Sequence, residues 1–158
     1  MTEALKVVET LAAQGATIAF AESCTGGLLT KLITDIPGAS AVLRGGVCAY
    51  ANEIKNGVLG VSQDDLDHYG AVSRPVALQM ARGVRRLMGT DIGVGTTGIA
   101  GPASDDTKKP VGLVYVAVAL PGGRYVAREL HLTGSRDAIR EETARCALAL
   151  VLEFSEHL

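Results

Sequence analysis

Short apolar runs alternate with amphipathic segments along this chain, and no other feature restricts its fold as strongly. Four apolar runs are predicted to be strands, at residues 16–20, 41–51, 91–97 and 111–120. The last run is followed by PGG and then by RYVARELHL, which alternates at period two and predicts the return strand of an antiparallel hairpin. Strands separated by helices predict a mixed sheet with helices on its faces, an α/β/α sandwich.

Helical periodicity fills the intervals between these strands. Helices are predicted at residues 3–14, about 26–34, within NEIKNGVLG, after Ser62, from Ser73 to Gly89, and from Ser135 to about residue 154. Ser62, Ser73 and Ser135 stand where an N-cap is expected. In the helix after Ser73, the buried stripe is predicted to consist of Val76, Met80, Val84 and Leu87.

Composition and charge exclude several classes of protein. The 158 residues are 47% apolar and 20% charged, which fits one globular domain over residues 1–158. A formal net charge of −2 differs from the net positive charge that is typical of domains that bind nucleic acid. No apolar run approaches the length of about 20 residues that spans a bilayer, and the N-terminus lacks the pattern of a signal peptide. Three widely spaced cysteines suit a reducing compartment, so we expect a cytoplasmic protein without a membrane partner.

The stretch AESCTGG, residues 21–27, lies where the first strand turns into a helix. Such a junction has three uses: a helix cap, a cradle for a phosphate, or a sharp turn that presents a nucleophile. Composition favours the cap, supplied by Ser23 or Thr25. Cys24 is a rival nucleophile, because a thiol at a helix N-terminus often has a depressed pKa; a small buried apolar residue is its more common role.

The search for a catalytic base leads to a lysine. None of the three histidines has metal-ligand spacing, HExxH and CxxC are absent, and we expect neither a metal nor a cofactor. A lysine is a base when burial lowers its pKa. YANEIK carries Tyr50 and Lys55 across a strand-to-helix junction, and a tyrosine hydroxyl between Ser23 and Lys55 would relay the proton. On spacing alone, an edge tyrosine and a solvated helix lysine are the more common roles of such residues.

Six motifs occur in the order seen in one known family. AESCTGGLLTKLITDIPGAS, GGVCAYANEIK, GAVS, TGIAGP, KPVG and GSRDAIR together resemble the CinA C-terminal domain, which is similar to the nicotinamide-nucleotide amidohydrolases. The resemblance runs from about residue 3 to residue 154. It implies an α/β/α sandwich that hydrolyses the carboxamide of nicotinamide mononucleotide (NMN) to nicotinate mononucleotide and ammonia without a metal.

The resemblance also implies roles for particular residues. Ser23 is the implied nucleophile, Lys55 the general base and Tyr50 its partner, while Thr97 and Arg136 match positions that shape the substrate pocket. The remaining substrate-binding residues that we predict are Thr25, Gly26, Gly45, Gly46 and Asn52. We further expect backbone N–H groups near Ser23 or at Gly45 and Gly46 to hold the oxyanion.

One segment departs from the family's pattern. Relatives commonly carry GPGGGTPEKPVG, whereas this chain has GPASDDTKKPVG, with Ala103, Ser104, Asp105 and Asp106 in place of flexible residues. The aspartates would repel a phosphate, so two alternatives stay open: a nucleotide-binding module without catalysis, and an amidohydrolase for a related carboxamide such as the riboside. Many relatives have an additional N-terminal domain, and we expect a stand-alone form. The expected partners are a small-molecule nucleotide and a second copy in a homodimer.

Overall fold

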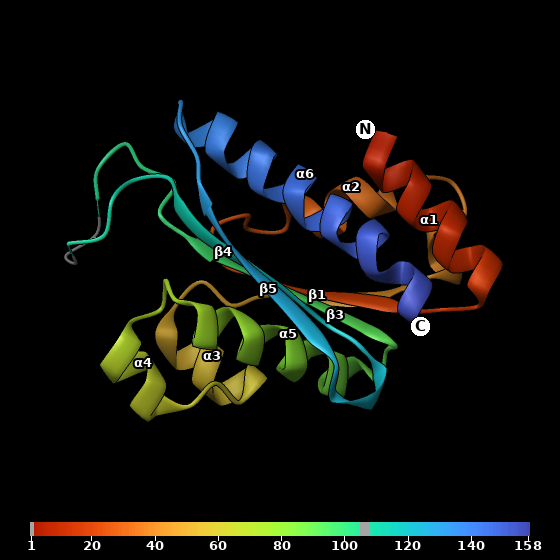
Figure 1. Ribbon diagram of the computed structural model, residues 1–158, viewed down its shortest axis with the longest axis horizontal. Coiled ribbons are helices and arrows are strands. Elements are labelled where there is room, and N and C mark those ends of the chain that lie inside the picture. Colours follow the sequence, from red (N-terminus) through yellow and green to blue (C-terminus); the bar gives the residue numbers. More distant parts are fainter. Residues whose placement is uncertain (1, 105–107) are drawn as a thin grey trace.

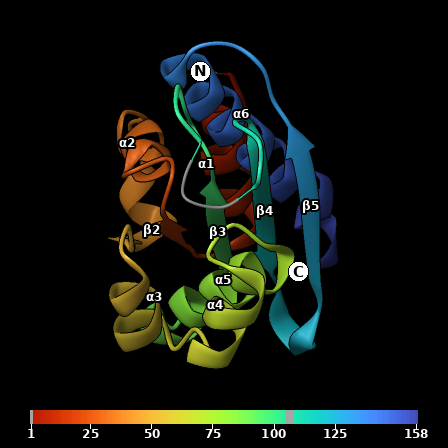
Figure 2. The same cartoon turned by 90° about the vertical axis from the view of Figure 1, so that its left-hand side faces the viewer.

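In the computed structural model, which describes residues 2–104 and 108–158, the strands form one mixed sheet (Figure 1). The described strands are β1 (Ile18–Glu22), β2 (Leu43–Cys48), β3 (Ile92–Gly98), β4 (Leu113–Ala119) and β5 (Tyr125–His131). They lie in the order β2-β1-β3-β4-β5, and Figure 2 shows β3, β4 and β5 side by side. The first three are mutually parallel, and β4 and β5 run antiparallel as the predicted hairpin.

Helices cover both faces of this sheet (Figure 1). One layer contains α1 (Thr2–Gln14), α2 (Leu28–Thr34) and α6 (Arg136–Phe154), and the other contains α3 (Asn52–Leu59), α4 (Gln63–Tyr69) and α5 (Arg74–Met88). The predicted α/β/α sandwich with a mixed sheet and a C-terminal hairpin is therefore confirmed. Within residues 2–104 and 108–158, no helix combines the length and apolarity needed to cross a membrane.

The core has two parts because successive side chains of a strand point to opposite faces. In β1, Ile18 and Phe20 belong to the core under α1, α2 and α6, while Ala19 and Ala21 belong to the core under α5. The helix α5 lies very close to the sheet, since a Cβ on Gly95 would collide with its backbone. This close packing fixes the end of β3, which carries part of the candidate site.

Two of the three predicted serine caps have the expected hydrogen bond. The Ser62 hydroxyl accepts from the backbone N–H of Asp65, at 3.2 Å, and that of Ser135 accepts from Ala138, at 3.1 Å. The Ser73 hydroxyl instead donates to the Gly70 carbonyl, at 2.8 Å.

The buried stripe of α5 departs from its prediction at one position. Val76, Met80 and Val84 are fully buried, but Leu87 is 52% exposed. A spacing of four residues from Val84 leads to Met88, which packs against the core in its place.

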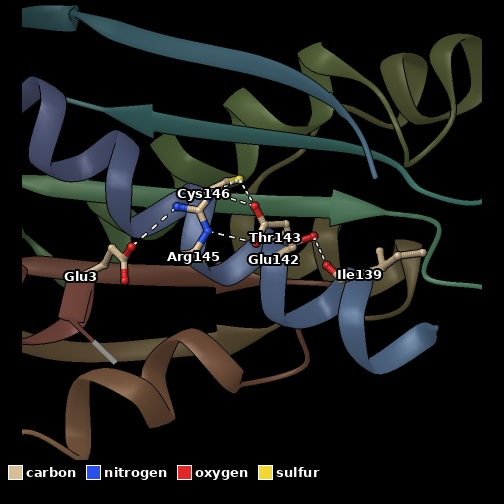
Figure 3. Close-up of polar contacts among 6 residues, drawn as sticks. All are labelled: Glu3, Ile139, Glu142, Thr143, Arg145 and Cys146. Atoms are coloured by element: carbon tan, nitrogen blue, oxygen red, sulfur yellow. Dashed lines mark hydrogen bonds and ion pairs between the residues drawn. The ribbon is translucent and has the colours of Figure 1, made fainter. Parts of the chain in front are cut away.

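The outer helices are also joined by polar contacts, shown in Figure 3. The Arg145 guanidinium pairs with Glu142 one turn earlier in α6, at 2.6 Å, and with Glu3 of α1, at 3.6 Å. The Thr143 hydroxyl donates to the Ile139 carbonyl, at 2.7 Å. Exposed pairs of this kind contribute about 1 kcal/mol or less, so apolar packing holds α1 against α6.

Candidate active site

The carboxyl ends of β1 and β3 meet at one edge of the sheet, and a pocket of about 280 Å³ opens there. Ser23 directly follows β1, and its backbone N–H donates to the Thr96 carbonyl of β3, at 3.0 Å. The pocket is lined by residues 23–24, 50, 52, 55, 71–72, 97–101, 103–104 and 136. Ligands commonly bind at this edge of an α/β sheet.

Ser23 and Lys55 lie in direct contact at the bottom of this pocket. The Lys55 Nζ is 3.0 Å from the Ser23 Oγ and also donates to the Tyr50 carbonyl, at 2.9 Å. The lysine side chain is 1% exposed although it belongs to the first turn of a short helix. Burial lowers the pKa of Lys55 to about 8, because an ammonium loses its hydration there. The amine is thus able to take a proton from the serine near neutral pH.

Tyr50 does not stand between these two residues, so its predicted relay role is corrected. Its side chain is 66% exposed, and its hydroxyl accepts from Arg136, at 3.3 Å. The backbone carbonyl of Tyr50, rather than its phenol, contacts Lys55. The reason is the length of the lysine side chain, which reaches the Ser23 hydroxyl from α3 without an intermediate. Tyr50 therefore belongs to the rim of the pocket.

Three further predicted residues line the pocket: Arg136, Thr97 and Asn52. Arg136 is the first residue of α6, and it donates to the Gly101 carbonyl, at 2.6 Å, as well as to Tyr50. The Thr97 hydroxyl donates to the Ala71 carbonyl, at 2.9 Å. This hydrogen bond connects the end of β3 to the wall of the pocket that contains Ala71. Arg136 places a positive charge at the rim, at the N-terminal end of a helix.

Gly45 and Gly46 do not line the pocket, so the predicted role of this pair in binding the substrate and the oxyanion is wrong. The other expected place for the oxyanion, the backbone N–H groups near Ser23, stays a prediction. They lie inside β2, in register with Ala19 and Phe20 of β1. Another group approaches the backbone closely at this pair: a Cβ on Gly46 would lie 2.5 Å from the Thr30 hydroxyl. The group that approaches is a side chain of α2 and not a substrate.

Thr25 and Gly26 also lie outside the pocket lining. The Thr25 side chain is fully buried and shares a hydrogen bond with the Thr96 hydroxyl, at 2.8 Å, and Gly26 adopts a positive φ of 59° within the turn. Thr25 does not cap α2, whose N-cap is Gly27. Both residues shape the turn rather than the binding surface.

Glu22, which sequence reasoning missed, satisfies free N–H groups at the start of α2. Its buried carboxylate accepts from the backbone N–H groups of Leu29 and Thr30, at 2.8 and 3.1 Å, and from the Thr30 hydroxyl, at 2.8 Å. Glu22 is 1% exposed, so these three donors replace its hydration. The last residue of β1 thereby fixes where α2 starts relative to Ser23.

Arg140 is the second residue that sequence reasoning missed. From α6 it donates to the carbonyls of Cys24 and Thr25, at 3.1 and 3.0 Å. It is the last residue of the motif GSRDAIR, one turn after Arg136. That spacing is the available signal, because residues four apart share one face of a helix. Arg140 holds the turn that carries the nucleophile.

Cys24 is a poor rival to Ser23. Burial raises the pKa of its thiol to about 12, so the reactive thiolate is scarce near neutral pH. We expect Cys24→Ala to change kcat for the reaction proposed below by less than about threefold, because the residue acts as a small apolar side chain. Steady-state kinetics of the purified variant measure this. Loss of turnover in Cys24→Ala with retention in Ser23→Ala would instead identify the thiol as the nucleophile.

Part of the departing segment reaches the pocket. Ala103 and Ser104 line it, whereas Asp105 and Asp106 lie outside the described residues. Among the residues that are described, histidine, cysteine and acidic side chains nowhere gather in a group of three able to hold a metal ion. The Ser23 hydroxyl and the Lys55 amine are among the groups that line this pocket.

Comparison with known proteins decides the family. The profile of the CinA C-terminal domain matches residues 2–155. This chain belongs to the CinA C-terminal domain family. A CinA-like protein of Anaeromyxobacter sp. (strain Fw109-5) is 52% identical over 145 residues, which are 92% of this chain and 35% of that protein. The chain spans about a third of the length of the curated relatives it matches.

Solved structures of CinA proteins share the whole fold. The competence/damage inducible protein CihA from Agrobacterium tumefaciens has a TM-score of 0.94 at 37% identity, covering 98% of this chain and 94% of that one. A CinA superfamily protein from Klebsiella pneumoniae has a TM-score of 0.96 at 30% identity, covering 99% and 98%. CinA proteins from several bacteria therefore share the fold described above.

Proposed function

We propose that this CinA domain hydrolyses the carboxamide of NMN to nicotinate mononucleotide and ammonia. The observation that carries the proposal is the 3.0 Å contact between the Ser23 hydroxyl and the buried amine of Lys55. A serine is a weak nucleophile until a base removes its proton. A lysine with a pKa of about 8 is such a base, and both groups face the pocket.

The proposed reaction is acyl transfer through a nicotinoyl ester. Ser23 Oγ attacks the carboxamide carbon while its proton passes directly to Lys55 Nζ. The tetrahedral intermediate then collapses: the C–N bond breaks and the leaving nitrogen takes the proton from Lys55, which releases ammonia. Water attacks the ester carbon and gives its proton to Lys55, and that proton returns to Ser23 Oγ as the acid leaves.

The rest of the pocket supports a phosphorylated substrate. Its volume of about 280 Å³ is close to the lower end of the range for small-molecule sites, about 300 Å³. Arg136 lies at the rim, where a guanidinium binds a phosphate through charge-assisted hydrogen bonds. NMN has its carboxamide at one end and its phosphate at the other, which matches a nucleophile at the bottom and a cation at the rim.

The test is a coupled assay of purified protein with NMN that measures ammonia, together with chromatographic identification of nicotinate mononucleotide. Stoichiometric formation of both products supports the proposal. Saturable binding of NMN by calorimetry without ammonia would favour the alternative of a nucleotide-binding module. Turnover of the riboside at a kcat/KM equal to or above that of NMN would favour an amidohydrolase of a related carboxamide.

Arg136→Ala separates recognition of the phosphate from the chemistry. We expect kcat/KM for NMN to fall about tenfold to a hundredfold, since hydrogen bonds to charged groups contribute about 1.5–3 kcal/mol. Turnover of the riboside, which lacks the phosphate, should change less than about threefold. The control is Arg44→Ala, which removes an exposed arginine of β2. Equal losses for NMN and the riboside would contradict a role in binding the phosphate.

The rate should depend on the protonation of Lys55. The amine acts as a base only when neutral, and its pKa is about 8. We therefore expect kcat/KM to rise with pH and level off above pH 8, and to be about tenfold below the plateau at pH 7. Initial rates between pH 6 and pH 10, with stability checked at each value, measure the profile. A rate independent of pH over this range would exclude Lys55 as the general base.

A further inference from the structure

A second hollow, of about 600 Å³, lies away from the candidate active site. It is bounded by the last turn of α5, the residues that lead into β3, and the turn between β4 and β5. Figure 1 shows that turn close to the end of α5, at the opposite end of the sheet from the start of α6. The hollow shares no lining residue with the pocket that contains Ser23.

Arginines dominate the lining of this hollow: Arg82, Arg85, Arg86 and Arg124. None of them forms an ion pair with a carboxylate in residues 2–104 and 108–158. Arg145 is different, because two carboxylates surround it (Figure 3). The one acidic residue of the lining, Asp91, uses Oδ2 to accept from the backbone N–H and hydroxyl of Thr17, at 2.8 and 3.1 Å. The hollow therefore carries a concentrated positive charge.

Three of these arginines are held by contacts that leave their terminal nitrogens without a hydrogen-bond partner among the residues that the structure describes. Arg85 donates through Nε to the Asp91 carbonyl, at 2.8 Å, and Arg124 through Nε to the Pro121 carbonyl, at 3.0 Å. The Arg82 guanidinium lies over the Tyr125 ring, 4.9 Å from its centroid. Ordering a long side chain in advance reduces the entropy lost on binding. The two terminal N–H groups of a guanidinium match the geometry of a phosphate.

The helix dipole accounts for only part of this cluster. Cations are favoured in the last turn of a helix, and Arg85 and Arg86 lie in the last turn of α5. Arg82 lies one turn earlier, and Arg124 belongs to the β4–β5 turn. Charges of the same sign from two elements that converge on one hollow repel each other. A bound anion would relieve this repulsion.

The size and floor of the hollow restrict the ligand further. Its volume is within the range of about 300–1,000 Å³ found for small-molecule sites. Ala119 and Leu120 line the hollow but are only 2% and 4% exposed, so the apolar surface beside the guanidinium groups comes mainly from the aliphatic stems of the arginines. A site that combines apolar surface with guanidinium groups suits an organic molecule with a phosphate group better than an inorganic ion.

We propose that this hollow, defined by Arg82, Arg85, Arg124 and Leu120, is a second binding site that takes a phosphorylated small organic molecule. It is separate from the reaction proposed above and does not depend on it. The phosphate lies among the guanidinium groups of α5 and the β4–β5 turn, and the organic part fills the rest of the hollow.

The test is a titration with AMP, adenosine and inorganic phosphate, followed by the amide signals of the ¹⁵N-labelled protein. We expect AMP to shift the signals of Gly89, Thr90 and Gly123 in a saturable way, and to bind more tightly than either fragment. The signals of Gly98 and Gly101 report separately on the pocket that contains Ser23. A saturable AMP shift confined to Gly98 and Gly101, or equal affinities for AMP and inorganic phosphate, would overturn the proposal.

Matched variants test the arginines. In the double variant Arg85→Gln/Arg124→Gln, we expect the affinity for AMP at the hollow to fall at least about tenfold, because two charge-assisted contacts are lost. Arg44→Gln makes the same change of charge per residue at an exposed position of β2 and should leave the affinity unchanged. Equal weakening in both variants would mean that AMP responds to net charge alone, and the proposal would fail. Unchanged amide spectra of the unliganded variants establish that they are folded.

Discussion

Ser23→Ala should lower kcat for release of ammonia from NMN by at least about a thousandfold, as removal of a nucleophile does in other hydrolases. The variant loses the atom that would form the nicotinoyl ester, and Lys55 is left without the hydroxyl that it contacts at 3.0 Å. NMN should still bind, because Arg136 and the pocket walls remain. The expected signature is therefore a collapse of kcat with a nearly unchanged dissociation constant for NMN.

This prediction is tested by three measurements on Ser23→Ala: ammonia release, calorimetric binding of NMN, and thermal unfolding. Ser40→Ala is the control, since it makes the same chemical change at an exposed position away from the pocket. Undiminished ammonia release by Ser23→Ala would remove the serine from the mechanism. A covalent nicotinoyl adduct trapped on the wild-type protein, and absent from the variant, would identify the attacking atom directly.

Lys55→Met should abolish activity to a similar degree and yet stabilise the fold at neutral pH. The pKa of Lys55 falls from its ordinary value of 10.5 to about 8 on folding. Below pH 8 the folded protein therefore carries a buried charge at a cost of about 3 kcal/mol. Methionine removes that cost but leaves the Tyr50 carbonyl without its donor, a loss of about 1–3 kcal/mol. We expect the variant to be up to about 2 kcal/mol more stable at pH 7.

The dependence on pH gives the sharper test of this prediction. Between pH 8 and pH 10.5 the unfolded chain binds more protons at Lys55 than the folded chain does, so the stability of the wild type should rise with pH. Lys55→Met has no such group, and its advantage should shrink by about 3 kcal/mol across this window. Urea unfolding of both proteins at pH 7, 8, 9 and 10.5 measures the difference. A constant difference would show that the pKa of Lys55 is not depressed.

Periodicity predicted most of the fold because its elements depend on local spacing. The hairpin from residue 111 onward follows from alternation at period two and from PGG, and the caps at Ser62 and Ser135 follow from residue type. The predicted buried stripe of α5 is wrong at Leu87. At the end of a helix, the next buried residue after Val84 can follow at a spacing of three or of four residues. Only the burial of Met88 decides between them.

The site was harder to predict because its supports act on the backbone. Glu22 and Arg140 bind N–H and carbonyl groups, which every residue carries, so no partner residue type reveals them. Glycines within a strand, such as Gly45 and Gly46, permit another group to approach the backbone closely. A sequence does not say whether the approaching group is a ligand or, as in this fold, the side chain of Thr30.

The Glu22 carboxylate has a consequence for the direction in which a substrate enters. In many nucleotide-binding folds the N-terminus of the helix after the first strand holds a phosphate. In this chain two N–H groups of that terminus are already satisfied by an internal carboxylate, which would also repel a second anion. For the reaction proposed above, we therefore expect the phosphate of the substrate to stay at the entrance beside Arg136 of α6 while its carboxamide reaches Ser23.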